Sequence, residues 1–169
     1  MTHRLMLIAT LSAALLTGCM THPMSAQEFR EAVPGSFSAK VETYEVNRPF
    51  REVASTFDKM APQCLQVSIE TTSRTAQSYQ RYTTTYTPTV RKSPERVELH
   101  VQQHVDNTIK ISDEPEGGYF LLVADAYPVG KSTTRVEVFR PSMGYGVLAK
   151  AIEGWASGNN LGCPDLTKV

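Results

Sequence analysis

The sequence predicts an α+β domain in which antiparallel strands follow one another as a meander and two helices pack on one face of the sheet, in the order β-α-β(n)-α. Three observations support this fold class. Apolar residues recur with a period of two over most of the chain. They take a helical spacing in two short segments. The length of 169 residues suits one domain, whose core can stand without a cofactor.

Several segments alternate apolar and polar residues as half-buried strands do. In residues 95–105 the apolar side chains are expected to point inward and the polar ones, His100 and His104 among them, outward. Residues 119–126 are apolar on both faces, so we expect them to form the central strand. Further strands are predicted at 37–46, 65–70, 78–87, 108–112 and 133–139, and Pro88 is expected to end the one at 78–87.

The two segments with helical spacing are residues 50–61 and 144–157. Pro62 is expected to end the first helix and Gly158 the second. Trp155 lies on the apolar stripe of the second helix, so we expect it in the core and not in a substrate site.

The charge balance excludes one large class of function. The chain has 17 Lys and Arg against 17 Asp and Glu, which is not the basic composition of a nucleic-acid-binding protein. A charged fraction of 20%, with scattered apolar residues, also excludes a disordered chain and a polytopic membrane protein.

The first residues have the pattern of a secretory signal: Arg4 precedes an apolar run, residues 5–16, that is too short to span a membrane. Directly behind it, Leu16-Thr17-Gly18-Cys19 resembles the lipobox of bacterial lipoprotein precursors. The resemblance implies removal of residues 1–18 and acylation of Cys19, with palmitate as a typical acyl chain. Position 20 is Met and not the Asp of the inner-membrane retention signal, so the resemblance implies a small lipoprotein anchored in the outer membrane and facing the periplasm.

Residues 19–36 are predicted to be a lipidated tether, followed by a single domain over residues 37–169. Two prolines and the lack of a clear period favour a flexible segment, with one loose turn around residues 26–32. Such a tether spans about 20–25 Å, enough to lift the domain clear of the lipid headgroups.

With Cys19 assigned to lipid by this resemblance, Cys64 and Cys163 remain. Two thiols in an oxidising compartment favour a disulfide. Two unrelated buried thiols are the alternative. Neither cysteine has a second cysteine or histidine at the spacing of a metal site.

Two glycine-containing segments resemble nucleotide-binding motifs without completing them. Residues 144–149 fit G-x-G-x-x-A, but the dinucleotide motif also needs a following parallel strand that carries an acidic residue. Residues 130–133 resemble the end of a P-loop, which requires glycine where Asp125 stands. We expect residues 130–133 to be a hairpin turn and the glycines of residues 144–149 to form a tight turn where the second helix begins.

The sequence predicts no metal site. His100 and His104 lie about 13 Å apart if they are on a strand, which is too far for two ligands of one zinc ion. We expect both to be solvated. The acidic turn at 113–116 lacks the calcium-loop pattern.

One strand is unusually rich in tyrosine and threonine, and it offers a possible binding surface. Tyr82 and Tyr86 share one face of this strand, while Tyr79 and Arg81 share the other. Such a strand suits sugar stacking or pairing with a partner strand. The alternative is a solvent-exposed strand of good β-formers.

Two functional hypotheses remain. The first is a non-catalytic envelope lipoprotein with a binding or accessory domain, since the sequence offers no nucleophile–base pair and no set of metal ligands. The second is a carrier of apolar ligands, because a strand, a helix, a meander and a final helix are similar to the helix-grip arrangement of lipid-transfer domains. That family encloses a cavity beneath the last helix, but it has two helices after the first strand where this chain has one.

Overall fold

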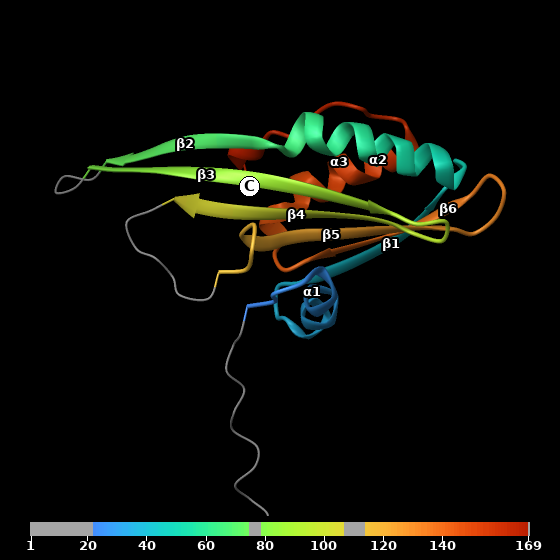
Figure 1. Cartoon of the computed structure of the whole chain (residues 1–169), viewed down its shortest axis with the longest axis horizontal. Coiled ribbons are helices and arrows are strands. Elements are labelled where there is room, and N and C mark those ends of the chain that lie inside the picture. The colour runs from blue at the N-terminus through green and yellow to red at the C-terminus, as the bar shows by residue number, and fades with distance from the viewer. Residues whose placement is uncertain (1–21, 75–78, 107–113, 169) are drawn as a thin grey trace, which may run out of the picture.

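The computed structural model describes residues 22–74, 79–106 and 114–168, which form three α-helices and one six-stranded sheet (Figure 1). The helices are α1 (Ala26–Ala32), α2 (Phe50–Leu65) and α3 (Gly146–Ser157). The strands are β1 (Lys40–Val46), β2 (Val67–Arg74), β3 (Tyr79–Lys92), β4 (Val97–Asp106), β5 (Tyr119–Pro128) and β6 (Thr134–Arg140). Short 3-10 turns are η1 (Val33–Gly35), η2 (Met143–Tyr145) and η3 (Leu166–Lys168). Within these ranges no helix has the length and apolar character needed to cross a membrane.

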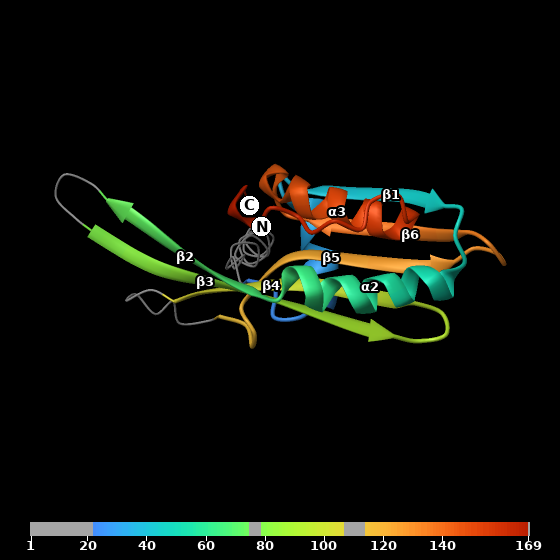
Figure 2. The same cartoon turned by 90° about the horizontal axis from the view of Figure 1, so that it is seen from above.

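All neighbouring strands run antiparallel, in the order β1-β6-β5-β4-β3-β2. Strands β2 to β6 form a meander, because each pairs with the next along the chain. Strands β1 and β2 lie at opposite edges of the sheet, and α2 connects them across its face (Figure 2). The chain is therefore α+β with an open antiparallel sheet, as the sequence predicts.

Helices α2 and α3 lie side by side on one face of the sheet, here called the inner face (Figure 2). Trp155 and Leu148 of α3 and Phe57 of α2 are fully buried there, with Leu99 and Leu122 of the sheet. The inward-facing alternation of β4 and the core position of Trp155 are thus confirmed. The main core fills the space between the two helices and the sheet.

Helix α1 packs on the opposite, outer face, where the sequence predicts part of a tether (Figure 1). Ser25 begins the helix by accepting a hydrogen bond from the backbone N–H of Glu28 at 3.1 Å. A second, smaller core forms beneath it from the side chains of Ala26, Phe29, Val33 and Val123. The helical turn expected at residues 26–32 is present, but the prediction that this part of the tether is flexible is wrong, because α1 is fixed to the sheet. The three apolar residues of the segment have helical spacing, and burying them on β5 stabilises a helix that would be marginal alone.

Both prolines that were expected to end elements lie inside them. Pro62 is within α2, which continues to Leu65 because Cys64 and Leu65 are buried in the core. Pro88 is within β3 and pairs with Val101 of β4. The pairing of β2 with β3 ends at Tyr86, so Pro88 lies where β3 is an edge strand, which is where sheets tolerate proline.

A disulfide joins Cys64, in the last turn of α2, to Cys163, which follows α3, as the sequence predicts. Their Cα atoms are 5.0 Å apart, within the ordinary range for a bridge. The bridge ties the C-terminal segment to α2. The predicted strand at 108–112 and the lipobox, Cys19 included, lie outside the described residues.

Candidate functional site

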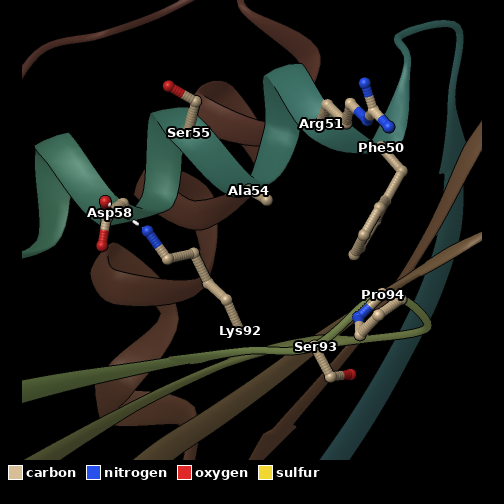
Figure 3. Close-up of a pocket in the computed structure, with 8 residues that line it drawn as sticks. All are labelled: Phe50, Arg51, Ala54, Ser55, Asp58, Lys92, Ser93 and Pro94. Atoms are coloured by element: carbon tan, nitrogen blue, oxygen red, sulfur yellow. Dashed lines mark hydrogen bonds and ion pairs between the residues drawn. The ribbon is translucent and has the colours of Figure 1, made fainter.

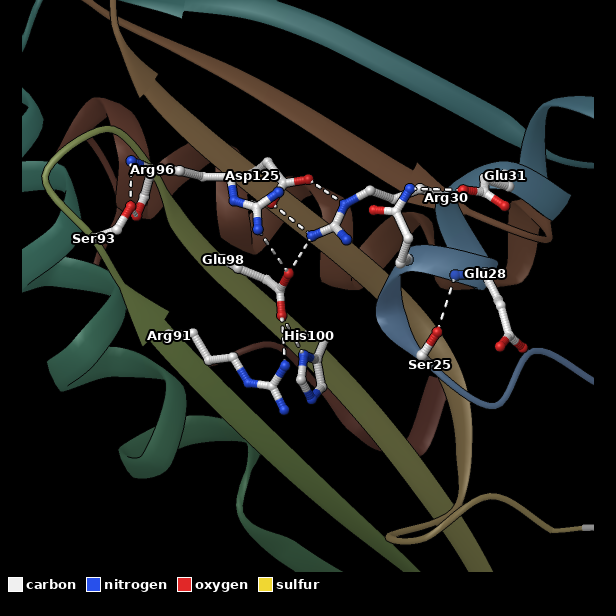
Figure 4. A network of polar contacts seen from close by, with 11 residues as sticks. Ser25, Glu28, Arg30, Glu31, Arg91, Ser93, Arg96, Glu98, His100 and Asp125 are labelled. Atoms are coloured by element: carbon white, nitrogen blue, oxygen red, sulfur yellow. Dashed lines mark hydrogen bonds and ion pairs between the residues drawn. The ribbon is translucent and has the colours of Figure 1, made fainter.

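A buried cluster of charged side chains lies on the outer face beneath α1 (Figure 4). Arg30 of α1 donates two hydrogen bonds to the carboxylate of Asp125 in β5, at 2.5 Å from Nε and 2.8 Å from Nη2. The same Nη2 donates to Oε2 of Glu98 in β4. Asp125 is 0% exposed and Glu98 4%. Two-pronged contacts between arginine and a carboxylate are among the strongest polar contacts in proteins, so this cluster holds α1 on the sheet.

Two more arginines stand at the rim of the cluster (Figure 4). Arg96 lies 3.7 Å from Glu98 and 3.8 Å from Asp125, and Arg91 lies 3.9 Å from Glu98. Their side chains are 42% and 72% exposed, so solvent screens these longer contacts. The two buried carboxylates are therefore paired mainly by Arg30, which is the one arginine of the three that is itself mostly buried.

His100 belongs to the same cluster, and the prediction that it is solvated is wrong. It is 4% exposed, its Nδ1 lies 3.1 Å from Oε1 of Glu98, and its ring contacts Phe120 edge-on. The side chain points to the outer face as predicted, but α1 and its contacts cover that face. His104 does remain half-exposed, with Nδ1 2.7 Å from Oε1 of Glu114.

The cluster changes the acidity of its members. The hydrogen bond from His100, together with the hydrogen bond and positive charge of Arg30, holds the pKa of Glu98 at about 2, although burial alone would raise it. For Arg30, burial alone would lower the pKa, but hydrogen bonds to Asp125 and Glu98 raise it above its ordinary value. Both groups are therefore charged throughout the ordinary pH range, and neither is suited to exchange protons with a substrate near neutral pH.

This acidity predicts how stability depends on pH. The pKa of Glu98 falls from 4.5 to about 2 on folding, so its stabilising contribution is complete above about pH 5. The contribution is lost as the pH falls from 4.5 toward 2. We expect the free energy of unfolding to depend on pH more steeply in the wild type than in Glu98→Gln between these values, by up to about 1.4 kcal/mol per pH unit. Urea unfolding at a series of pH values measures the difference, and parallel curves would contradict the assignment.

A groove lies on the other side of the molecule, between α2 and the turn that joins β3 to β4 (Figure 3). Its volume is about 380 Å³, and we call it the α2 groove. It is lined by Phe50, Arg51, Ala54, Ser55, Asp58, Lys92, Ser93 and Pro94. Phe50 and Pro94 give it an apolar part, while Asp58 and Lys92 point toward one another across it and form an ion pair at 2.6 Å. Arg51 adds an exposed positive charge.

A second depression of similar volume, about 380 Å³, lies beside His104 and the turn before β5. That turn is fixed by Gln102, whose Nε2 donates to the carbonyl oxygens of Glu116 and Gly118 at 2.7 and 2.8 Å. At Gly118 the backbone has φ +102°, and a Cβ would lie 2.3 Å from the carbonyl oxygen of Gln103. The turn is therefore held tightly, and it carries fewer apolar side chains than the α2 groove.

The tyrosine-rich strand forms part of a hairpin that extends beyond the rest of the sheet (Figure 2). Tyr79 is 67% exposed, and Arg81 is exposed and paired with Glu70 of β2. Tyr82 is half-buried, but Tyr86 is only 4% exposed and belongs to the main core. The predicted binding surface is therefore wrong for Tyr86, because β3 enters the layered part of the domain at that point. Tyr79, Arg81 and Tyr82 remain available.

The turn expected at residues 130–133 is confirmed, whereas most of residues 144–149 is helical. Residues 130–133 join β5 to β6, and residues 144–149 lead through η2 into α3. Within the described ranges, no group of three histidine, cysteine or acidic side chains is placed to hold a metal ion.

Comparisons with known proteins do not assign the chain to a family. No family model matches the sequence, and no curated protein is similar to it. Among solved structures, the crystal structure of a di-domain ARO/CYC protein, BexL of the BE-7585A biosynthetic pathway, is similar in part at a TM-score of 0.35 and 10% identity. The similar region covers 73% of this chain and 46% of the other. A structural similarity at this level gives no information about function.

The sequence did not reveal the charged cluster, because its members are far apart in the chain. Arg30 lies 95 positions from Asp125 and 68 from Glu98. One signal was present: Asp125 is a lone acid in the otherwise apolar strand predicted to be central. An acid in a buried strand needs a partner of opposite charge.

Proposed function

We propose that this protein is a non-catalytic cell-envelope lipoprotein, anchored in the outer membrane through Cys19, whose folded domain binds a partner molecule on the periplasmic side. The lipobox at residues 16–19, directly behind a short apolar segment, supports the anchor. The disulfide between Cys64 and Cys163 is consistent with an oxidising compartment.

The α2 groove is the observation that supports a binding role. It combines an aromatic side chain, Phe50, with two cationic side chains, Arg51 and Lys92, in a concave surface. Concave sites that mix apolar walls with a few polar groups are the usual form of ligand sites. The charged cluster on the outer face is a poorer candidate, because Arg30, Glu98 and Asp125 already satisfy one another.

The proposed anchor predicts how the protein is lipidated and where it sediments. Labelled palmitate should be incorporated into the wild type, and Cys19→Ser should abolish both the incorporation and sedimentation with the outer membrane, because the thiol is the acceptor of the lipid. Fractionation of labelled cells measures both effects. A Cys19→Ser protein that still sediments with the outer membrane would contradict lipid anchoring.

The groove is tested by a photo-crosslinking amino acid placed at Ser55, which lines it, and at Gln63, an exposed position on the same helix outside it. We expect a crosslinked product at Ser55 and not at Gln63, whether the bound molecule is small or a protein. Phe50→Ala should reduce that product several-fold. The same products at both positions, or a product that Phe50→Ala leaves unchanged, would show that the groove is not a binding site.

The second candidate is a carrier of apolar ligands of the helix-grip type. The strand order β1-β6-β5-β4-β3-β2 with α3 across the inner face is similar to that arrangement. However, Trp155, Phe57 and Leu65 are fully buried between the helices and the sheet, where such a ligand would lie. Native mass spectrometry of the delipidated domain decides this point, because a carrier should retain an apolar ligand during purification.

A further inference from the structure

The segment from His22 to Gly35, here called the clasp, contacts β5 at several points, and α1 within it packs on the outer face of the sheet. The His22 ring packs edge-on against Tyr119, with centroids 4.8 Å apart. Phe29 packs against Phe120 at 5.9 Å. Arg30 then reaches Asp125 through two hydrogen bonds. These contacts follow β5 from its first residue nearly to its end, so the clasp is fixed to the sheet at several points.

The first described residue of the clasp is only three positions from Cys19 in the sequence. Three residues of peptide span at most about 11 Å. The headgroup layer on one side of a bilayer is about 5–8 Å thick. If Cys19 carries acyl chains, His22 is therefore held at or just above the headgroup surface.

Exposed apolar side chains lie on both sides of α1. Phe37, two residues after the clasp, is fully exposed, and Met24 within the clasp is 53% exposed. Such side chains partition favourably into a membrane interface. The exposed surface of α1 also carries Glu28 and Glu31, so attraction to anionic lipids is not what would hold it there. The short connection to the lipid and the exposed apolar side chains would instead hold α1 at the membrane surface.

We propose that the clasp fixes the lipid anchor to the outer face of the sheet, so that this face lies against the surface of a bilayer and α2, α3 and the α2 groove point away from it. This inference rests on the proposed acylation of Cys19. Figure 1 shows the geometry, with α1 on one side of the sheet and the two longer helices on the other. The domain is then oriented on the membrane, in contrast to one suspended from a flexible tether.

Arg30 is the residue whose loss should release the clasp. Without it, Asp125 and Glu98 would keep only the longer contacts with the exposed Arg91 and Arg96, and undocking α1 would return both carboxylates to water. Residues 20–39 would then form a free linker of about 20 residues, with a mean span of about 25 Å. The anchor would persist, but the domain would stand off the membrane in many orientations.

The test compares two exposed helical positions in the lipidated protein, Gln27 on α1 and Lys150 on α3. Each is replaced in turn by cysteine and labelled with a fluorophore, in vesicles of zwitterionic lipid that contain a nitroxide-labelled headgroup. Cys64 and Cys163 are already bonded, so the new thiol is the one that reacts. We expect several-fold stronger quenching at Gln27 than at Lys150. Equal quenching at the two positions would overturn the proposal.

With the label placed instead at Val41, which is 44% exposed on the outer face of β1 and lies outside the freed linker, Arg30→Ala should reduce quenching to the level found at Lys150 while the protein still floats with the vesicles. Arg81→Ala is the matched control, because it removes an exposed arginine with a single carboxylate partner, Glu70. Unchanged quenching in Arg30→Ala would also overturn the clasp. If the protein does not float, the proposed lipidation fails. The same comparison is then made on residues 20–169, which lack the Cys19 thiol, tethered by an N-terminal histidine tag to nickel-chelating lipids, where equal quenching again rejects the clasp.

Discussion

Replacing Trp155 with alanine is expected to lower the free energy of unfolding by about 3–5 kcal/mol, as large truncations in protein cores do. The side chain is 0% exposed and lies with Leu148 and Ile152 in the main core. Its indole N–H also donates to the carbonyl oxygen of Gly162 at 3.0 Å. Alanine would leave a cavity where α3 meets the sheet and would release one contact of the C-terminal segment.

Thermal unfolding of the mature chain measures this effect as a fall of roughly 6–20 °C in Tm. Trp155→Phe should lower the Tm by less than Trp155→Ala does, because phenylalanine keeps most of the ring volume and loses mainly the hydrogen bond to Gly162. Tyr79→Ala is a suitable control, since Tyr79 is an aromatic residue that is 67% exposed. If Trp155→Ala kept its Tm but lost a bound molecule, the side chain would serve a binding site and not the core.

The inner face of the sheet could be predicted from the sequence because its pattern is local. In β4, Val97, Leu99 and Val101 alternate with polar residues, and all three are fully buried beneath the helices. In α3, the apolar stripe that includes Trp155 has the period of a helix. Each pattern lies within about a dozen residues, where backbone geometry alone decides which side chains share a face.

The outer face could not be predicted in the same way. Alternation places Glu98 and His100 on the face opposite the core, which is correct, but it does not say what covers that face. The cover is a helix of seven residues, α1, for which the sequence indicates only a loose turn and not a contact with the sheet. It forms because Phe29 is buried on β5 and Arg30 finds two carboxylates there, and both conditions depend on the tertiary structure.

The proline errors have a related cause. A proline ends a helix or strand on local grounds, but tertiary contacts of the residues after it can outweigh that tendency. Pro62 is exposed, and the residues that follow it, Cys64 and Leu65, are buried and extend α2. Pro88 is tolerated because β2 no longer pairs with β3 at that point. Neither circumstance is visible in the sequence around the proline.

Reduction of the disulfide between Cys64 and Cys163 is expected to lower the free energy of unfolding by about 2–4 kcal/mol. The bridge closes a separation of 99 residues, for which loop-closure entropy alone gives about 4.7 kcal/mol, and measured bridges often deliver less. It also holds the segment that places Leu166, 6% exposed, in the main core. Loss of the bridge therefore raises the conformational entropy of the unfolded chain and removes a restraint on the C-terminal segment of the folded protein.

Urea unfolding with and without reductant measures this effect, and two serine variants separate its parts. Cys163 is exposed, so Cys163→Ser should match the reduced wild type and should not respond to further reductant. Cys64 is 4% exposed, so Cys64→Ser should have a somewhat lower free energy of unfolding than Cys163→Ser, because it also places a hydroxyl group in the core. The double variant should be no less stable than Cys64→Ser, since either substitution removes the same bridge. Two free thiols in protein purified from the cell envelope, or a reductant that leaves the unfolding midpoint of the wild type unchanged, would show that the bridge does not stabilise this domain.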